Sequence, residues 1–217
     1  AYLLTPIGRG ASMGVHESQS RMMENQIARS RPFAEFLHPL LVAHFGEAAP
    51  ADPQALYQAM NRVETGFIRT EADEVQYNLH IMLRFEIEQQ MLNGKLATKD
   101  VPDYWNTHFA EYVGITPPDD AQGCLQDIHW SMGALGYFAT YTLGNLNAAQ
   151  LFAAARRDPA VEAGLEAADY LPLLDWMRTR IHSRGSVLLP DDLITEATGS
   201  PPDSSHHLEH LKRRYLG

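Results

Sequence analysis

The chain has only one cysteine, Cys124, among its 217 residues. A single cysteine cannot form an internal disulfide, which excludes a disulfide-stabilised scaffold and makes a reducing compartment the default expectation. Basic residues are also scarce, with 17 lysines and arginines against 27 aspartates and glutamates and a net charge of −10. Because the longest basic cluster is Lys212–Arg214, we expect no binding to the phosphate backbone of a nucleic acid.

Long apolar runs and strand patterns are missing as well. No stretch approaches the roughly 18 apolar residues that a membrane-spanning helix requires, so we predict a soluble, cytoplasmic protein without a membrane partner. Runs of alternating β-branched residues joined by Asn-Gly or Asp-Gly turns, which are typical of β-hairpins, do not occur.

Helical periodicity, by contrast, recurs along the whole chain. Apolar residues at spacings of three and four predict one helix over residues 68–92, ending at Asn93-Gly94. We predict an all-α fold, an irregular helical domain without a sharp internal boundary. The other predicted helices cover 18–45 with a break near Arg31-Pro32 or His38-Pro39, then 53–63, 103–113, 125–157, 170–184, 190–198 and 204–215.

Three segments, residues 16–21, 68–74 and 123–130, carry more titratable side chains than a helical core needs. Each has an ordinary structural interpretation. An acidic residue such as Glu17 suits the first turn of a helix, Arg69 and Asp73 could form an i,i+4 ion pair on a solvated face, and His129 could be a hydrogen-bonded core histidine.

Taken together and in this order, the segments resemble the motif series of the carboxypeptidase Taq family of zinc metallocarboxypeptidases. The matching motifs are His16-Glu17-Ser18-Gln19, Ile68-Arg69-x-x-Ala72-Asp73 and Gly123-x-x-Gln126-Asp127-x-His129-Trp130. Flanking similarity covers Tyr77–Glu86, Tyr141–Asn145, Ala197–Gly199 and Tyr215. The resemblance implies a hydrolase that releases single C-terminal amino acids from peptides, and a homodimer.

One family motif is missing. Members of the family are more than twice as long and carry a His-Glu-x-x-His helix upstream, whose histidines bind zinc and whose glutamate is the general base. No such motif occurs in these 217 residues. We therefore expect residues 1–217 to be the C-terminal portion of the catalytic domain, one half of a two-lobed helical metallopeptidase, and to be inactive alone.

The resemblance also implies roles for individual residues around one zinc ion. Glu17 corresponds to the third zinc ligand, with His16 and Gln19 beside the metal site. Arg69 corresponds to the group that binds the substrate's C-terminal carboxylate, because a guanidinium offers two parallel donors. Asp73, with Glu71 and Glu74, is expected to hold this arginine in place.

A second group of residues is expected to act on the peptide itself. His129 resembles the family's substrate-binding histidine and could also donate a hydrogen bond to the developing oxyanion. Tyr141, with Tyr137 as second choice, could donate a phenolic hydrogen bond nearby. We further predict that Glu17, Arg69 and His129 face one shared concave surface.

Two alternatives remain at this point. The chain could be a non-catalytic helical protein that binds peptides or partners without turnover. The cluster of His206, His207, Glu209 and His210 near the C-terminus looks metal-binding, but exposed histidines are ordinary in an amphipathic terminal helix, so we assign no metal there.

Overall fold

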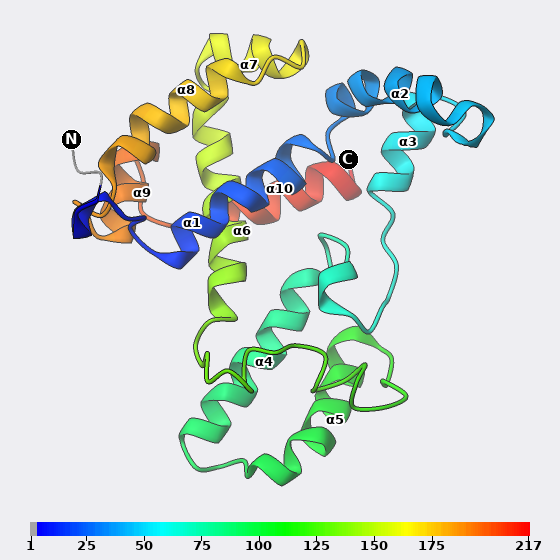
Figure 1. Ribbon diagram of the computed structural model, residues 1–217, viewed down its shortest axis with the longest axis vertical. Coiled ribbons are helices and arrows are strands. Elements are labelled where there is room, and N and C mark those ends of the chain that lie inside the picture. Colours follow the sequence, from blue (N-terminus) through cyan, green and yellow to red (C-terminus); the bar gives the residue numbers. More distant parts are fainter. Residues whose placement is uncertain (1–3) are drawn as a thin grey trace. The chain divides into compact units, whose positions relative to one another are not determined.

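Every regular element that the structure describes is a helix. A computed structural model describes residues 4–217, and no strand occurs among them, which confirms the all-α prediction (Figure 1). The α-helices are α1 (Met13–Arg21), α2 (Arg31–Phe45), α3 (Pro53–Met60), α4 (Tyr77–Leu92), α5 (Val101–Val113), α6 (Ala139–Ala155), α7 (Pro159–Glu166), α8 (Leu171–Arg180), α9 (Pro190–Thr198) and α10 (Ser205–Tyr215). A π-helical segment, Met22–Ile27, continues α1 directly. Within residues 4–217, no helix is both long enough and apolar enough to span a membrane.

The chain divides into two compact units. Unit 1 combines the residues up to Asn61 with Leu143–Gly217, and unit 2 is Arg62–Thr142. Helix α6 carries the chain from unit 2 into unit 1, because the division falls between Thr142 and Leu143 inside that helix. The assignment of residues 1–217 to one portion of a catalytic domain stays a prediction.

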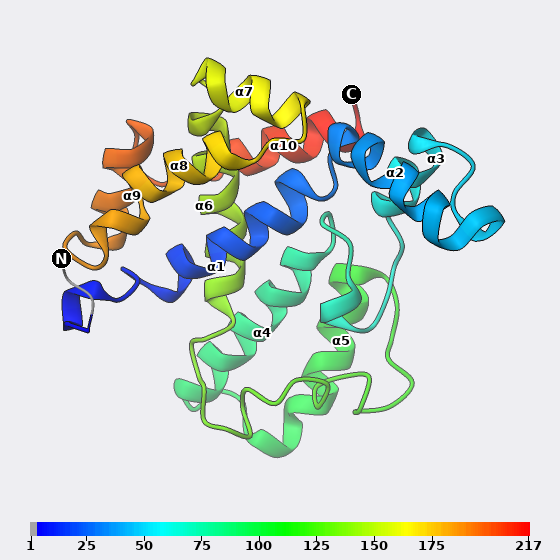
Figure 2. The ribbon, with the colours of Figure 1, turned by 45° about the horizontal axis from the view of Figure 1, so that its top comes forward.

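Helix α6 forms the centre of the core of unit 1. Leu151 and Ala155 are fully buried, and they belong to one apolar cluster with Val15 of α1, Met177 of α8 and Leu193 of α9. A helix that is apolar around most of its circumference is stable only when other helices cover it. Both ribbon views show α10 crossing α6 (Figures 1 and 2).

Local capping determines where helices of unit 1 begin. The Ser30 hydroxyl accepts the backbone N–H of Phe33 at the start of α2, and an Asp52 carboxylate oxygen accepts that of Ala55 at the start of α3. Pro53 occupies the first turn of α3, where its missing N–H costs no hydrogen bond.

Helices α4 and α5 form the core of unit 2 through aromatic packing. Trp105 and Phe109 of α5 stack with ring centroids 6.0 Å apart, and they pack with the buried Leu83 and Ile87 of α4. The burial of these large side chains provides most of the apolar surface that can stabilise a unit of this size.

Residues 114–138 contain no α-helix and are attached to α4 by a buried carboxylate. Glu88 accepts the indole N–H of Trp130 at 2.9 Å and the backbone N–H of Gly136 at 3.1 Å. Gly133 and Gly136 have φ angles of +72° and +81°, a backbone conformation that glycine adopts without strain.

Two predicted long helices are therefore wrong in part. Of the helix predicted over 68–92, only Tyr77–Leu92 is α-helical, because Asp73 accepts the backbone N–H groups of Val75 and Gln76 and the chain before it is extended or 3₁₀. Of the helix predicted over 125–157, only Ala139–Ala155 forms. The predicted end at Asn93-Gly94 is confirmed, with Gly94 at a φ of +68°.

The remaining helix predictions agree more closely with the structure. The break near Arg31-Pro32 is confirmed at Ser30, whereas Pro39 lies inside α2 without ending it. Helix α7 was not predicted at all, and α8 stops at Arg180, short of the predicted residue 184. The predicted helices over 190–198 and 204–215 match α9 and α10 to within one residue.

Candidate functional site

Arg69 is the most tightly held of the proposed site residues. It lies in a 3₁₀ turn of unit 2, only 6% exposed. Its Nη2 donates to Asp127 Oδ1 at 2.6 Å, its Nε donates to the same carboxylate, and its Nη1 donates to the Tyr77 hydroxyl at 2.9 Å. The guanidinium plane is thereby fixed from two sides.

Backbone contacts fix the turn that carries Arg69. The Arg69 N–H donates to Gln126 Oε1 at 2.8 Å, and the Gln126 side-chain amide donates to the carbonyl of Phe67 at 3.0 Å. The two motifs that contain Arg69 and Gln126 therefore fold against each other within unit 2.

Asp127 also binds a second arginine. Arg84 of α4 is 1% exposed, and its Nε donates to Asp127 Oδ2 at 2.8 Å, with Nη2 2.7 Å from the same oxygen. Burial lowers the pKa of Arg84 to about 10 in spite of this carboxylate, so the side chain stays charged at neutral pH. One carboxylate between two guanidinium groups leaves a cluster with a net charge of +1.

The pKa values of Arg69 and Asp127, the other two residues of the cluster, are shifted so that the charged form of each is favoured. Burial acts against the charge of Arg69, but the hydrogen bond to Asp127 and the neighbouring Tyr77 raise its pKa. Burial likewise opposes the Asp127 carboxylate, and Arg69 and Arg84 together lower the pKa of that group. Both groups are therefore ionised at neutral pH.

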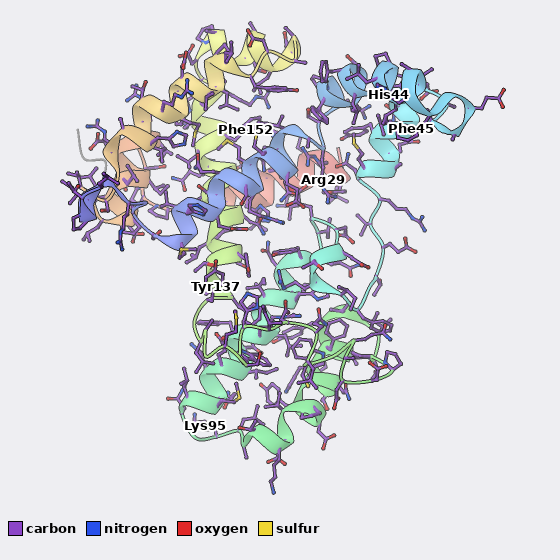
Figure 3. All side chains as sticks on the ribbon, in the orientation of Figure 1. Arg29, His44, Phe45, Lys95, Tyr137 and Phe152 are labelled. Atoms are coloured by element: carbon purple, nitrogen blue, oxygen red, sulfur yellow. The ribbon has the colours of Figure 1, made fainter. Side chains whose placement is uncertain are left out.

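His129 lies beside this cluster. Its Nε2 is 3.1 Å from the Tyr141 hydroxyl, and its Nδ1 is 3.9 Å from Asp127 Oδ1. The Tyr137 ring centroid is 5.4 Å away, and Tyr137 is labelled in Figure 3. The side chain is 14% exposed and sits in a turn, not in the buried helix that we predicted. Burial, followed by the charges of Arg69 and Arg84 acting against Asp127, lowers the pKa of His129.

The structure brings together four of the predicted residues in unit 2: Arg69, His129, Tyr137 and Tyr141. Arg69 stacks over the Tyr141 ring, with its Cζ 4.8 Å from the centroid, and Tyr141 also contacts His129. The i,i+4 pair between Arg69 and Asp73 does not form, because Arg69 pairs with Asp127 instead.

Asp73 supports Arg69 only indirectly. Its Oδ1 accepts the N–H groups at the start of α4, and its Oδ2 accepts the N–H of Glu64 at 3.0 Å. Glu74 is 2% exposed, whereas Glu71 is exposed. The carboxylate that we expected near Arg69 is Asp127, a residue inside the third motif to which the sequence assigned no role.

Glu17 lies on α1 in unit 1 and is half-buried. Its carboxylate has no hydrogen-bond or ion-pair partner among residues 4–217. A Cβ placed on Gly144 of α6 would come 2.8 Å from Glu17 Cγ and 2.9 Å from its Cβ, so only glycine there accommodates the glutamate as it stands.

The neighbours of Glu17 have different surroundings. His16 is exposed. The Gln19 amide donates to Ser18 Oγ at 2.9 Å, and its Oε1 lies 2.9 Å from His182 Nε2. Because Glu17 and these residues belong to unit 1, while Arg69 and His129 belong to unit 2, the shared concave surface stays a prediction.

The residues present fit one part of a metal site. Glu17 is a half-buried carboxylate without a cation beside it in residues 4–217, and a carboxylate is one of the ligand types that zinc accepts. In the described chain, however, no three His, Cys, Asp or Glu side chains converge as a metal site would require.

The histidines near the C-terminus are less exposed than expected. His207 and His210 of α10 are 3% and 5% exposed, which corrects the interpretation of this helix as carrying exposed histidines. Their rings stack with centroids 6.4 Å apart.

Comparisons with known proteins give the family. The profile of the carboxypeptidase Taq (M32) metallopeptidases matches residues 1–215. The chain is 41% identical over 216 residues to thermostable carboxypeptidase 1 of Pyrococcus furiosus, covering 99% of this chain and 43% of that protein. It is 37% identical to carboxypeptidase 1 of Bacillus subtilis, covering 97% of this chain and 42% of that protein.

Solved structures agree with the sequence comparison. The carboxypeptidase of Pyrococcus furiosus superposes with a TM-score of 0.94 at 41% identity, over 99% of this chain and 44% of that one. Metallocarboxypeptidase 1 of Trypanosoma cruzi gives a TM-score of 0.91 at 40% identity, over 96% and 44% of the two chains. The chain thus spans less than half the length of these relatives, and it belongs to the carboxypeptidase Taq (M32) family of metallopeptidases.

Proposed function

We propose that this chain contributes to a zinc-dependent metallocarboxypeptidase that releases single C-terminal amino acids from peptides. In this proposal Glu17 is a zinc ligand, and Arg69, His129 and Tyr141 recognise the peptide end. Two histidine ligands and a glutamate base come from a segment outside these 217 residues. We further propose a cytoplasmic homodimer, and the single cysteine fits a reducing compartment.

The observation that carries the proposal is the fixed Arg69 guanidinium with its unused donors. A guanidinium has five N–H donors, and the bonds to Asp127 and Tyr77 use three of them. One donor remains on each terminal nitrogen, the number that a bidentate carboxylate pair requires. The net charge of +1 on the Arg69–Asp127–Arg84 cluster matches the single negative charge of a peptide C-terminus.

His129 and Tyr141 supply hydrogen bonds rather than charge. Because the pKa of His129 is lowered, the neutral imidazole predominates at neutral pH and can donate one N–H to a carbonyl oxygen. The contact between His129 Nε2 and the Tyr141 hydroxyl orients the ring. A preoriented neutral donor stabilises a developing oxyanion without rearranging during the reaction.

Glu17 is the residue of this chain that would hold the metal. A bound zinc ion would polarise the scissile carbonyl and lower the pKa of a bound water. The close packing of Glu17 against Gly144 limits the positions of the carboxylate, and restricted ligand positions favour a defined coordination geometry.

Substitutions in a longer protein that contains this chain test the proposal. Arg69→Lys keeps the charge but loses the planar fork, and we expect KM for an N-blocked dipeptide to rise roughly ten- to hundred-fold with zinc content unchanged. Glu17→Gln should lower zinc content, measured by metal analysis after dialysis.

Arg62→Lys provides the matched control, because Arg62 is a highly exposed arginine of the same unit that pairs only with Glu64. It should leave KM and zinc content at wild-type values. Unchanged KM in Arg69→Lys together with full zinc content in Glu17→Gln would contradict the proposal. A protein that binds the dipeptide but releases no amino acid would favour the non-catalytic alternative.

A further inference from the structure

Two adjoining cavities lie in unit 1, away from Glu17. Their volumes are about 310 and 360 Å³, and they share six lining residues: Gln26, Phe152, Arg156, Glu162, His210 and Arg213. These residues come from α6, the turn that follows it, α7, α10 and the π-helical segment Met22–Ile27. Phe152 is labelled on α6 in Figure 3.

The lining of the two cavities is basic, although the chain as a whole is acidic. Five arginines line them, against three glutamates, in a protein with a net charge of −10. The arginines are Arg31, Arg156, Arg157, Arg213 and Arg214. A concentration of one sign of charge around a concave site attracts ions of the opposite sign.

The carboxylates nearby neutralise only part of this positive charge. Glu162 is bound by Arg156, whose Nε donates to it at 2.6 Å and whose Nη2 makes a second bond. Arg157 and Arg213 form no ion pair with any carboxylate in residues 4–217. The pKa of Glu162 is lowered mainly by the hydrogen bond from Arg156. The charge of Arg213 lowers it further, which shows that Arg213 acts on the same site electrostatically.

Gln26 provides an independent observation. It is 4% exposed and lines both cavities, yet its side-chain amide forms no hydrogen bond with any residue that the structure describes. The amide atoms themselves stay accessible from the cavity, so the Gln26 N–H is available to a group that binds there. It also lies in a π-helical segment, an irregularity that is frequent at functional sites.

We propose that the two adjoining cavities, here together called the α10 cavity, form one site. This site binds a small tetrahedral anion with two negative charges, such as a phosphate group. Arg213 and Arg157 provide guanidinium groups without an ion-pair partner in residues 4–217, although Arg157 Nη1 also donates to the Thr198 carbonyl at 3.3 Å. The Gln26 amide donates an N–H to an anion oxygen. Arg156 is already oriented by its bonds to Glu162. Guanidinium groups match phosphate oxygens in geometry as well as charge.

Calorimetric titration of inorganic phosphate into the protein tests the α10 cavity. Arg213→Gln should weaken binding on the order of ten-fold, because it removes one charged donor. Gln26→Met, nearly equal in size, should weaken binding several-fold because it removes the amide donor, and it should leave the thermal midpoint in the absence of phosphate at or above that of the wild type. A variant that merely failed to fold would show a lowered midpoint.

Arg180→Gln is the matched control, because Arg180 is an exposed arginine of α8 outside the cavity lining, and it should bind phosphate like the wild type. Phosphate should raise the thermal midpoint of the wild type, and sodium chloride of equal ionic strength should not raise it comparably. Glycerol 3-phosphate distinguishes the source: binding equal to that of phosphate means that the site accepts a phosphate ester, and loss of binding means that it closes around the free ion. Absence of phosphate binding, or equal weakening in Arg213→Gln and Arg180→Gln, overturns the proposal.

Discussion

Asp127 holds two guanidinium groups at once, and this determines the charge of the candidate site in unit 2. Its side chain is 12% exposed, and those of Arg69 and Arg84 are 7% and 1% exposed. With so little water nearby, each arginine depends on this one carboxylate for compensation of its charge. Asp127 therefore serves both the stability of unit 2 and the orientation of Arg69.

Replacing Asp127 with asparagine should destabilise unit 2 strongly. Asparagine has nearly the same shape but no charge, so two buried guanidinium groups lose their counterion. Removing one partner of a buried ion pair typically costs about 3–5 kcal/mol. We expect a loss in that range, measured as a lower urea midpoint of unfolding.

The matched control is Asp175→Asn. Asp175 is 73% exposed and lies 3.4 Å from Arg178, and exposed pairs contribute about 0–1 kcal/mol. If Asp127→Asn cost no more than Asp175→Asn, the two arginines would have to be stabilised by other groups.

His80 makes the stability of the protein dependent on pH. It is fully buried, neither ring nitrogen has a hydrogen-bond partner among residues 4–217, and burial, with the charges of Arg84 and Arg69, lowers its pKa to about 3. Between pH 6.5 and 3, the unfolded chain binds a proton here that the folded chain does not. Stability therefore falls as the pH drops through this range, by up to about 1.4 kcal/mol per pH unit.

Substituting His80→Leu should remove this contribution. Relative to the wild type, the variant should gain roughly 2 kcal/mol of unfolding free energy between pH 7 and pH 4.5, measured by urea unfolding at both pH values. Phe109→Leu is the control, since the Phe109 ring packs against His80 at 5.2 Å but does not titrate. A constant difference between His80→Leu and wild type at the two pH values would show that His80 is protonated in the folded protein.

At the scale of the elements, local sequence signals decided which predictions succeeded. Helices α9 and α10 are amphipathic and have proline or serine at their starts, so their bounds follow from the sequence almost exactly. Residues 125–138 were predicted to be helical, but Glu88 binds Trp130 and Gly136, which lie 42 and 48 positions away in the sequence. Long-range bonds of this kind leave no periodic signal in the sequence.

In the candidate site, too, some features followed from the sequence and others depended on long-range contacts. The resemblance predicted that Glu17, Arg69 and His129 share one surface with Tyr141 nearby. The structure brings Arg69, His129 and Tyr141 together in unit 2, and the position of Glu17 relative to them stays a prediction. The predicted pairing of Arg69 with Asp73 was wrong. Their i,i+4 spacing brings two side chains together only in a continuous helix. Once the chain at Asp73 is extended, Arg69 reaches Asp127 instead.

Close packing of α1 on α6 predicts a specific effect at Gly144. Alanine there would place a Cβ 2.8–2.9 Å from the Glu17 side chain and 3.2 Å from its backbone carbon. Overpacking of this kind costs about 1–3 kcal/mol, and we expect Gly144→Ala to lower the urea midpoint accordingly. In a longer protein that contains this chain, it should also lower zinc affinity by displacing Glu17.

Gly66→Ala is the control for this substitution, because a Cβ at residue 66 would contact nothing within 4 Å and its φ angle is not positive. It should change stability by less than about 0.5 kcal/mol. Wild-type stability and zinc affinity in Gly144→Ala would mean that α1 shifts freely on α6 and does not restrict Glu17.

At the scale of the whole molecule, the proposed function assigns residues for peptide recognition to this chain but only one metal ligand. Catalytic zinc normally takes three protein ligands and keeps one position open. Glu17 is one carboxylate, and the described residues offer no cluster of three candidate ligands. The chain covers about 43% of its relatives.

The 217-residue chain by itself should therefore bind zinc weakly and hydrolyse no blocked dipeptide. Too few ligands reduce the affinity, and the lack of a glutamate base removes a contribution of typically ~10²–10⁴-fold to the rate. Zinc calorimetry and a hydrolysis assay on this chain, with the longer protein as the positive control, measure both. Tight stoichiometric zinc binding with turnover by the 217 residues alone would contradict the prediction. If substitution of His206 or His210 then abolished zinc binding, the ligands would lie on α10 and the role proposed for Glu17 would be wrong.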